Sequence, residues 1–349
     1  MPYYEMYDWD LFAKWFEFNT DRYQSWNDLQ TYYQFDPYDS FLSYWRYGGY
    51  GGAVFCAYDS SVKFNGCVFE GNNSSSGLTG VGGANSFGNV PEPDRALNIP
   101  NAGGAVYAMF DCDLEFNDCI LSGNTASINV AELPHTIHVG FGGAVAYEYD
   151  CTARFSNCVF TENLASDGGA IYANESLTII QDCNVADNTA YLGAGLYQLQ
   201  NQADIENVKF RRNQATSPNF EPPVEITYLG QGGGMFAGGA GLTMTDSIFV
   251  DNAADFSGGG LFSVGENPIS SKIHNCLFAQ NRSGRDGGGA SIYWGAEPSI
   301  SNCTFADNYV SGRPGFMTGS GGGLYIGYNS TAKIIDSIFW LNSAVQGAQ

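Results

Sequence analysis

The sequence predicts an all-β fold, a parallel β-helix of about nine coils that follows an aromatic-rich N-terminal segment. The first observation is that an asparagine recurs nine times, each time five residues after a cysteine, serine or valine. The second is a glycine-rich turn ahead of each unit; the clearest unit runs from Gly168 to the next turn at Gly193, a period of 25 residues. Repeats of this length stack on copies of themselves, because a single unit cannot bury its own apolar face.

Each unit predicts three short strands. In the clearest one, apolar stretches lie at 170–172, 177–180 and 183–186, and polar or turn-forming residues separate them. These stretches are too short for helices, and their regular spacing does not suit a sandwich. Strands of this length in successive coils would pair in parallel, about 4.8 Å apart.

Two columns of apolar residues are expected to fill the interior. The first lies three residues before the cysteine position: Phe64, Phe116, Phe155, Ile180, Ile205, Met244, Ile273, Ile300 and Ile334. The second lies two residues after it: Phe69, Leu121, Phe160, Val185, Phe210, Phe249, Phe278, Phe305 and Phe339. Because side chains alternate along a strand, one face of each strand is predicted to be buried and the other to meet water.

The recurring asparagines predict a structural ladder rather than a catalytic site. They are Asn72, Asn124, Asn163, Asn188, Asn213, Asn252, Asn281, Asn308 and Asn342. At a tight corner, a side-chain amide can bond to the backbone or to the amide one coil away. The glycine pairs would form the other corner, where positive φ or close approach of two coils excludes a Cβ.

Residues 1–50 differ in composition from residues 51–349, which carry the repeats. They are rich in aromatic residues, include Trp9, Trp15, Trp26 and Trp45, and show no repeat. Helical spacing of some of these residues predicts a partly helical cap over the first coil. The alternative is an aromatic patch that binds sugars or a partner.

Four insertions interrupt the repeats, at 73–102, 125–141, 214–231 and 309–320. All four leave from the corner that follows the asparagine. Insertions grouped along one edge of a solenoid often build its binding face, so this edge is the expected place for a ligand. The alternative is that they are tolerated loops without a function.

The repeat strings resemble those of a known family. Gly51-Gly52-Ala53-Val54 and Gly168-Gly169-Ala170-Ile171, which alternate with Phe-x-x-Asn units, are similar to the repeats of chlamydial polymorphic outer membrane proteins. The strict Phe-x-x-Asn units begin at Phe69, Phe160, Phe210, Phe249, Phe278, Phe305 and Phe339. The resemblance covers residues 51–349, and it implies a right-handed parallel β-helix from an exported or surface protein of bacteria.

Charge restricts the partners. Asp and Glu outnumber Lys and Arg by 36 to 14, which gives a net charge of −22. Nucleic acid is an unsuitable partner, because binding a phosphate backbone requires clustered cations. A glycan or a cell-surface protein is the expected partner, and the sequence leaves the oligomeric state open. The first residues lack the pattern of a signal peptide, and no stretch reaches the apolar length of a membrane helix.

The cysteines predict structural thiols. Cys67, Cys119, Cys158, Cys183, Cys276 and Cys303 share one inward column, and Cys112 and Cys151 share another. No pattern typical of zinc occurs, so no metal site or cofactor is predicted. Calcium stays open as an alternative at Asp187, Asp251 and Asp307, which each precede a ladder asparagine.

Two functions follow from the sequence. The favoured one is an exported or surface-exposed scaffold with an adhesin-like or ligand-binding role. The alternative is a polysaccharide-active enzyme, a lyase or a glycoside hydrolase, although no catalytic residue can be named. Three or more convergent carboxylates with an Arg or Lys beneath the insertions would favour the enzyme, and a broad shallow face would favour the scaffold.

Overall fold

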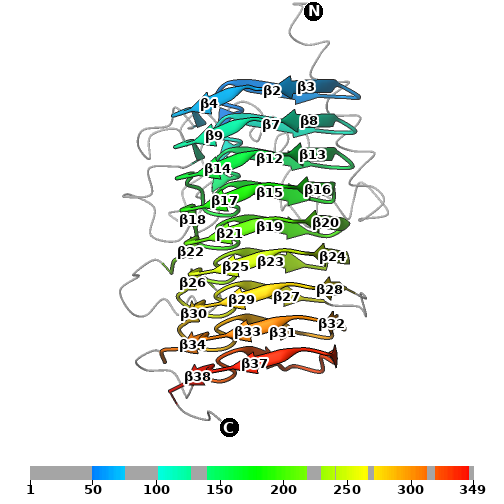
Figure 1. The fold of residues 1–349 in the computed structure, drawn as a ribbon. Coiled ribbons are helices and arrows are strands. Elements are labelled where there is room, and N and C mark those ends of the chain that lie inside the picture. Colours follow the sequence, from blue (N-terminus) through cyan, green and yellow to red (C-terminus); the bar gives the residue numbers. More distant parts are fainter. Residues whose placement is uncertain are drawn as a thin grey trace, which may run out of the picture.

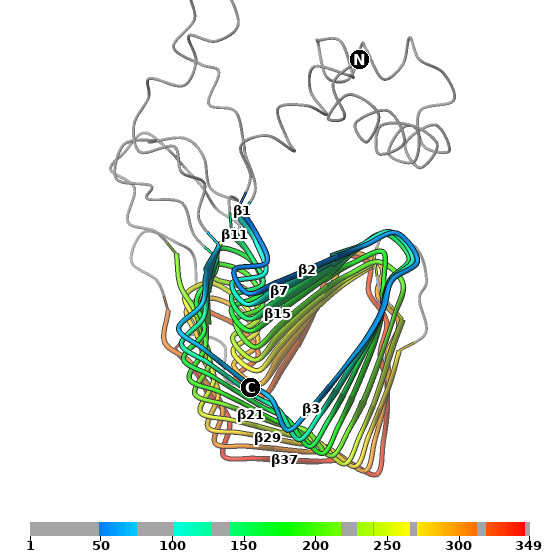
Figure 2. The same cartoon turned by 90° about the horizontal axis from the view of Figure 1, so that it is seen from above.

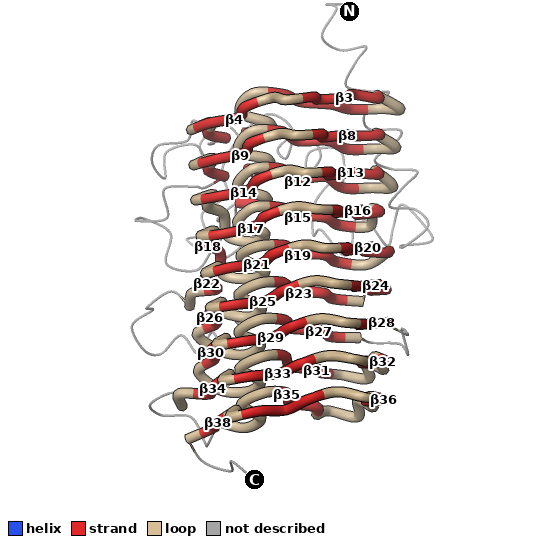
Figure 3. Tube along the Cα trace, in the orientation of Figure 1, coloured by secondary structure: helices blue, strands red, loops and turns tan. Residues whose placement is uncertain are grey.

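The computed structural model describes residues 49–74, 101–126, 140–217, 229–239, 241–265, 271–312 and 319–345. In this part every regular element is a strand, and the strands stack into nine coils (Figures 1 and 3). All pairings between coils are parallel, consistent with the right-handed parallel β-helix that the sequence predicts. The fold class is thereby confirmed. The predicted helical cap lies outside the described residues except for Gly49–Tyr50, which form the short strand β1.

Three nine-stranded sheets enclose the interior, and a view along the axis shows them as the sides of a triangle (Figure 2). The β2 sheet contains β2 (Val54–Ala57), β7 (Val106–Met109), β12 (Val145–Glu148), β15 (Ile171–Asn174), β19 (Leu196–Leu199), β23 (Met235–Gly238), β27 (Leu261–Val264), β31 (Ala290–Tyr293) and β35 (Leu324–Ile326). The β3 sheet contains β3 (Ser61–Asn65), β8 (Asp113–Asn117), β13 (Thr152–Ser156), β16 (Leu177–Gln181), β20 (Gln202–Glu206), β24 (Gly241–Thr245), β28 (Lys272–His274), β32 (Ser299–Ser301) and β36 (Lys333–Ile335). The β4 sheet contains β4 (Val68–Glu70), β9 (Ile120–Ser122), β14 (Val159–Thr161), β17 (Asn184–Ala186), β21 (Lys209–Arg211), β25 (Ile248–Val250), β29 (Leu277–Ala279), β33 (Thr304–Ala306) and β37 (Ile338–Trp340).

Short two-residue strands follow the asparagine corner or directly precede the glycine corner, and the three-strand prediction did not include them. Six of them form the β18 sheet: β18 (Thr189–Ala190), β22 (Gln214–Ala215), β26 (Ala253–Ala254), β30 (Arg282–Ser283), β34 (Tyr309–Val310) and β38 (Ser343–Ala344). β5 (Asn73–Ser74) pairs with β10 (Thr125–Ala126), and β1 pairs in a separate sheet with β6 (Asn101–Ala102), which also pairs with β11 (Gly140–Phe141). A strand of two residues is too short to show an alternation of apolar and polar residues, so the sequence pattern cannot predict it.

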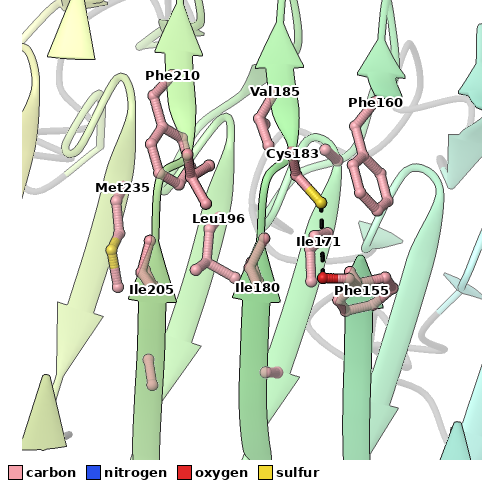
Figure 4. Close-up of a cluster of buried hydrophobic side chains, with 14 of the residues drawn as sticks. Phe155, Phe160, Ile171, Ile180, Cys183, Val185, Leu196, Ile205, Phe210 and Met235 are labelled. Carbon is pink, nitrogen blue, oxygen red and sulfur yellow. Dashed lines mark hydrogen bonds between the residues drawn. The ribbon is translucent and has the colours of Figure 1, made fainter. Parts of the chain in front are cut away.

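The two predicted apolar columns face each other inside the triangle. Phe155, Ile180 and Ile205 come from the β3 sheet, and Phe160, Val185 and Phe210 from the β4 sheet (Figure 4). All six are buried. Further along, the rings of the second column stack coil on coil, with centroids 4.6 Å apart for Phe210–Phe249 and 4.7 Å for Phe278–Phe305. Close stacking of identical rings in register fixes the coils against slippage.

A second apolar cluster covers the outer face of the β2 sheet, where no burial was predicted from the sequence. Tyr172, Tyr197 and Phe236 stack there with centroids 5.2 and 4.8 Å apart, and each is no more than 8% exposed. Leu192 and Leu229 pack against them from the corner that leads into this sheet. The solenoid is therefore apolar on both faces of one sheet.

The glycine corner shows why a side chain is excluded. Gly168 has a φ of +66°, which favours glycine. A Cβ on the adjacent Gly169 would lie 2.4 Å from the carbonyl oxygen of Ala194, on the next coil. Both reasons for glycine, backbone conformation and close approach of coils, operate at one corner.

Candidate functional site

The asparagines form one continuous file of hydrogen bonds along the solenoid. The backbone N–H and the Nδ2 of Asn163 both donate to the Oδ1 of Asn188, over 3.0 and 2.9 Å. The Nδ2 of Asn188 then donates to the Oδ1 of Asn213 and to the carbonyl oxygen of Phe160. The same bonds between amides join Asn72, Asn124, Asn163, Asn188, Asn213, Asn252, Asn281, Asn308 and Asn342. The seven inner asparagines are at most 1% exposed.

Because each ladder amide points inward, the residues on either side of it point outward. The preceding position is occupied by Glu162, Asp187, Arg212, Asp251, Gln280 and Asp307, all with φ between +51° and +59°. The following position, which begins the short strands, is occupied by Thr189, Gln214, Ala253, Arg282 and Tyr309. We call these two rows the flanking columns.

A groove of about 540 Å³ runs between the flanking columns. Its lining residues are Asp187, Arg212, Gln214, Asp251, Ala253, Gln280, Arg282, Asp307 and Tyr309. They come from five successive coils, so the groove extends along the solenoid for about 19 Å at 4.8 Å per coil. It is a cleft open to solvent rather than an enclosed cavity, since Arg212, Asp251 and Arg282 are exposed.

Opposite charges line the groove. The guanidinium of Arg212 donates two hydrogen bonds to the carboxylate of Asp187, over 2.7 and 2.6 Å. These bonds raise the pKa of Arg212. In the described ranges, no hydrogen bond or ion pair engages the side chains of Asp251, Arg282 or Asp307. One end of the groove therefore holds a closed ion pair, and the other holds charged groups that are available to a ligand.

Asp187, Asp251 and Asp307, the three carboxylates considered for calcium, all line this groove. They occur at every second coil, so their backbones are about 10 Å apart along the axis. Among the residues that the structure describes, no group of three or more His, Cys, Asp and Glu side chains is arranged to hold a metal ion. The groove contains the carboxylates and arginines that would favour an enzyme, but they are spread along successive coils and do not gather around one point.

The groove lies where two insertions begin. Gln214 and Tyr309 are the first residues of insertions 214–231 and 309–320. At the other ends of these insertions, Gln231 and Ser320 join a file of parallel bridges with Ser257 and Asp286 of uninterrupted coils. The chain therefore leaves and re-enters the solenoid along one edge, next to the flanking columns.

Sequence reasoning did not identify Arg212, Gln280, Arg282 or Tyr309. The signal that could have found them is their position directly before or after a ladder asparagine. The position after the asparagine faces water and the fold requires no particular residue there, so a charged or aromatic side chain at this position is informative. At the position before it, a positive φ favours Gly, Asn and Asp, so Arg212 and Gln280 depart from the preference of the backbone. No catalytic residue was predicted, and the groove contains no nucleophile next to a base.

A separate buried carboxyl lies on the outer face of the β2 sheet. Glu148 is 3% exposed, and burial raises its pKa from 4.5 to about 7, with a hydrogen bond to Tyr149 acting in the opposite direction. Within the described residues, its Oε1 has no hydrogen-bond partner. Burial raises the pKa values of Tyr50, Tyr107 and Tyr172, and the charge of the Glu148 carboxyl raises them further, so these rings lie around it.

All nine cysteines are free thiols, and only Cys67 is not buried. Thiols of neighbouring coils stack: the backbone N–H of Cys158 donates to the Sγ of Cys183 over 3.2 Å. The Sγ of Cys183 donates in turn to the carbonyl oxygen of Phe155 (Figure 4). These cysteines behave as small core residues that also satisfy backbone groups.

The comparison with family models finds the Chlamydia polymorphic membrane protein repeat at residues 157–174. This segment spans β14, the ladder residue Asn163, the glycine corner and β15. The chain therefore carries a polymorphic membrane protein repeat. The resemblance seen in the sequence is confirmed, and it is coarsely consistent with a protein of the cell surface. Searches of curated proteins and of solved structures found no match. In the described part of the chain, no helix is long and apolar enough to cross a membrane.

Proposed function

We propose that this protein is a surface-exposed β-helix scaffold with an adhesin-like role, and that it binds a glycan in the groove between the flanking columns. The observation that carries the proposal is the contrast within one corner. The inward asparagine is the same in every coil, whereas the outward residues form a groove of carboxylates, guanidinium groups, amides and one tyrosine. The surface-protein repeat at residues 157–174 supports the cellular location.

The chemistry of the groove suits a sugar polymer. Carboxylates, guanidinium groups and amides are hydrogen-bonding partners for hydroxyl groups, and a tyrosine offers an apolar ring with a polar tip. The groove is open along its length, which suits an extended chain better than a compact small molecule. Its residues are attached to strands that are fixed by the core, so little order has to be gained on binding.

One observation favours the alternative, a glycoside hydrolase. Asp251 and Asp307 lie two coils apart, about 10 Å between backbones, close to the range of about 6.5–9.5 Å for the carboxyl groups of inverting enzymes. A general acid, however, needs a shielded carboxyl that keeps its proton near neutral pH. Both carboxylates are exposed, which favours binding over catalysis.

A glycan array tests the proposal when it is screened with the full chain and two variants. Asp251→Asn changes a groove carboxylate, and Asp246→Asn is a matched control on the same coil. Asp246 is also exposed and has a positive φ, but it lies outside the groove and accepts a hydrogen bond from Asn275. We expect specific binding that Asp251→Asn weakens and Asp246→Asn retains. Absence of glycan binding, or equal loss in both variants, would exclude a glycan site in this groove.

A product assay on the glycans that bind separates the two functions. A scaffold leaves them intact, with no new reducing ends and no unsaturated products. If the wild type cleaves the glycans and both Asp251→Asn and Asp307→Asn lose this activity, the protein is a glycoside hydrolase rather than a binding scaffold.

A further inference from the structure

Glu148 and Asn174 interrupt an apolar column on the outer face of the β2 sheet. They are register partners on β12 and β15, so their side chains stand side by side, about 4.8 Å apart at the backbone. The same column holds Met109 on the preceding coil and Leu199 on the following coil. Neither of these side chains can donate a hydrogen bond, so the polar pair receives none from its apolar neighbours.

Three oxygen atoms at this place are buried and lack a partner. They are the Oε1 of Glu148, the Oδ1 of Asn174 and the hydroxyl oxygen of Tyr107, and none has a hydrogen bond within the part of the chain that the structure describes. Tyr107 lies on β7, the strand on the other side of β12. Burial raises the pKa of its hydroxyl, and the charge of Glu148 raises it further, so the hydroxyl lies near the carboxyl. Oxygen atoms from three neighbouring strands therefore gather at this carboxyl.

The described residues supply no cation for this carboxylate. In the described ranges, the ion pairs engage other carboxylates, those of Asp113, Glu115, Asp187 and Asp286. Burying an ionised carboxylate without a positive partner is costly, so Glu148 needs either a proton or a cation. A water molecule would donate to the acceptor oxygens but would leave the charge unpaired.

Charge and ligand number favour a monovalent cation. A single carboxylate calls for a single positive charge. Ca²⁺ takes about six to eight oxygen ligands, and Mg²⁺ demands near-ideal octahedral geometry, which one carboxylate, one amide and one hydroxyl do not provide. Aromatic faces also attract cations, and the rings of Tyr107 and Tyr172 lie around the carboxyl. The net charge of −22 enriches cations around the chain.

We propose that Glu148, Asn174 and Tyr107 form a binding site for a small monovalent cation, such as K⁺, Na⁺ or ammonium. The cation contacts the Oε1 of Glu148 and the Oδ1 of Asn174 and takes the place of the proton that the carboxyl releases on ionisation. Tyr149, which donates to the carboxyl, is half-buried, so the site lies within one side chain of solvent. The site is separate from the groove, and its failure would leave the proposed glycan binding unaffected.

Urea unfolding tests the site at a pH of about 8, where Glu148 is ionised. KCl, NaCl or NH₄Cl is exchanged stepwise for tetramethylammonium chloride, whose cation is too large for a buried site, at constant ionic strength. For the wild type, we expect at least one of the small cations to raise the midpoint. The ratio of folded to unfolded protein should rise about tenfold at an ion concentration ten times its Kd.

Three variants locate the effect. Glu148→Gln and Asn174→Leu should both lose the dependence on the cation, because each removes one of the two proposed oxygen ligands. Glu206→Gln, which removes an exposed carboxyl on the β3 sheet, should keep it.

Three outcomes overturn the inference. Equal wild-type midpoints in all four chlorides would show that no small cation binds. A dependence that persists in Glu148→Gln would show general screening of an acidic protein. A dependence that is lost in Glu148→Gln but unchanged in Asn174→Leu would show simple pairing with the carboxylate and refute the site as proposed.

Discussion

Asn188 and its two neighbours, Asp187 and Thr189, lie at one corner of the solenoid but face opposite sides of it, the interior and the solvent. Asn188 is buried, repeated in every coil and saturated with hydrogen bonds to the coils on both sides. Its neighbours point to solvent, and the same positions in other coils hold Arg212, Gln214 and other residues. Position in the repeat thus separates residues that the fold requires from residues that are free to bind a ligand.

Repetition of a residue has a different meaning at buried and at exposed positions of the solenoid. A buried polar group must find a partner in each coil, so the same residue has to recur. An exposed position carries no such requirement, so its charge pattern reflects the local backbone conformation, repulsion between coils or a ligand. The predictions below test how strictly this distinction holds.

The largest effect is expected at Glu148, a buried polar residue that occurs in one coil only. Its pKa is raised from 4.5 to about 7, so the folded state binds an extra proton between these pH values. The stabilising effect of this proton is complete below pH 4.5 and is lost as the pH rises to about 7, which costs about 3 kcal/mol of unfolding free energy. Glu148→Gln should remove this loss.

Urea unfolding at a series of pH values measures the effect. Glu162→Gln, an exposed carboxyl next to the ladder, is the control for removing one negative charge. If the decline with pH persists unchanged in Glu148→Gln, then this carboxyl is not its source.

A smaller loss is expected for Asn188→Ala, which removes one member of the repeated ladder. The backbone N–H of Asn163 and the carbonyl oxygen of Phe160 lose their bonds to this amide. Leaving buried polar groups unsatisfied destabilises the stack by about 1–3 kcal/mol. Urea melts should show a lower midpoint than wild type, whereas Asp251→Asn next to Asn252 should keep it. An unchanged midpoint in Asn188→Ala would refute the structural role of the ladder.

The reactivity of the cysteines tests the predicted burial of the interior in the wild-type protein. Eight of the nine thiols are buried. Alkylation of the native protein should therefore be slow for these eight, and all nine should react once urea exposes them. Intact-mass spectrometry counts the adducts. A protein that still carries unreacted pairs after denaturation, but gains adducts on reduction, would contain disulfides instead.

The smallest effect on stability is expected for Arg212→Ala in the groove. Its ion pair with Asp187 is exposed, and exposed pairs contribute little because water and salt screen them. The midpoint of urea unfolding should match that of Arg154→Ala, which removes another exposed ion pair, with Asp113 on the β3 sheet. A clearly larger loss in Arg212→Ala would mean that the flanking columns support the fold, and the distinction between the two surfaces would fail.

The repeat made most of the solenoid predictable from the sequence. The period of 25 residues, the inward columns such as Phe155 and Phe160, and the glycine corner at Gly168 each follow from local rules that hold in every coil. Where backbone geometry or burial imposes the same requirement on every coil, the same residue type recurs in the sequence. That is why the fold class could be read without a structure.

Only the tertiary structure showed which residues outside the repeated columns are buried and which of them lie next to each other. It buried Tyr172 and Tyr197 on the outer face of the β2 sheet, and it enclosed Glu148 among tyrosines. It also placed Arg212, Arg282 and Tyr309 in one groove with three aspartates. Residues brought together from different coils, up to about 120 positions apart from Asp187 to Tyr309, share no sequence pattern, because stacking rather than chain connectivity makes them neighbours.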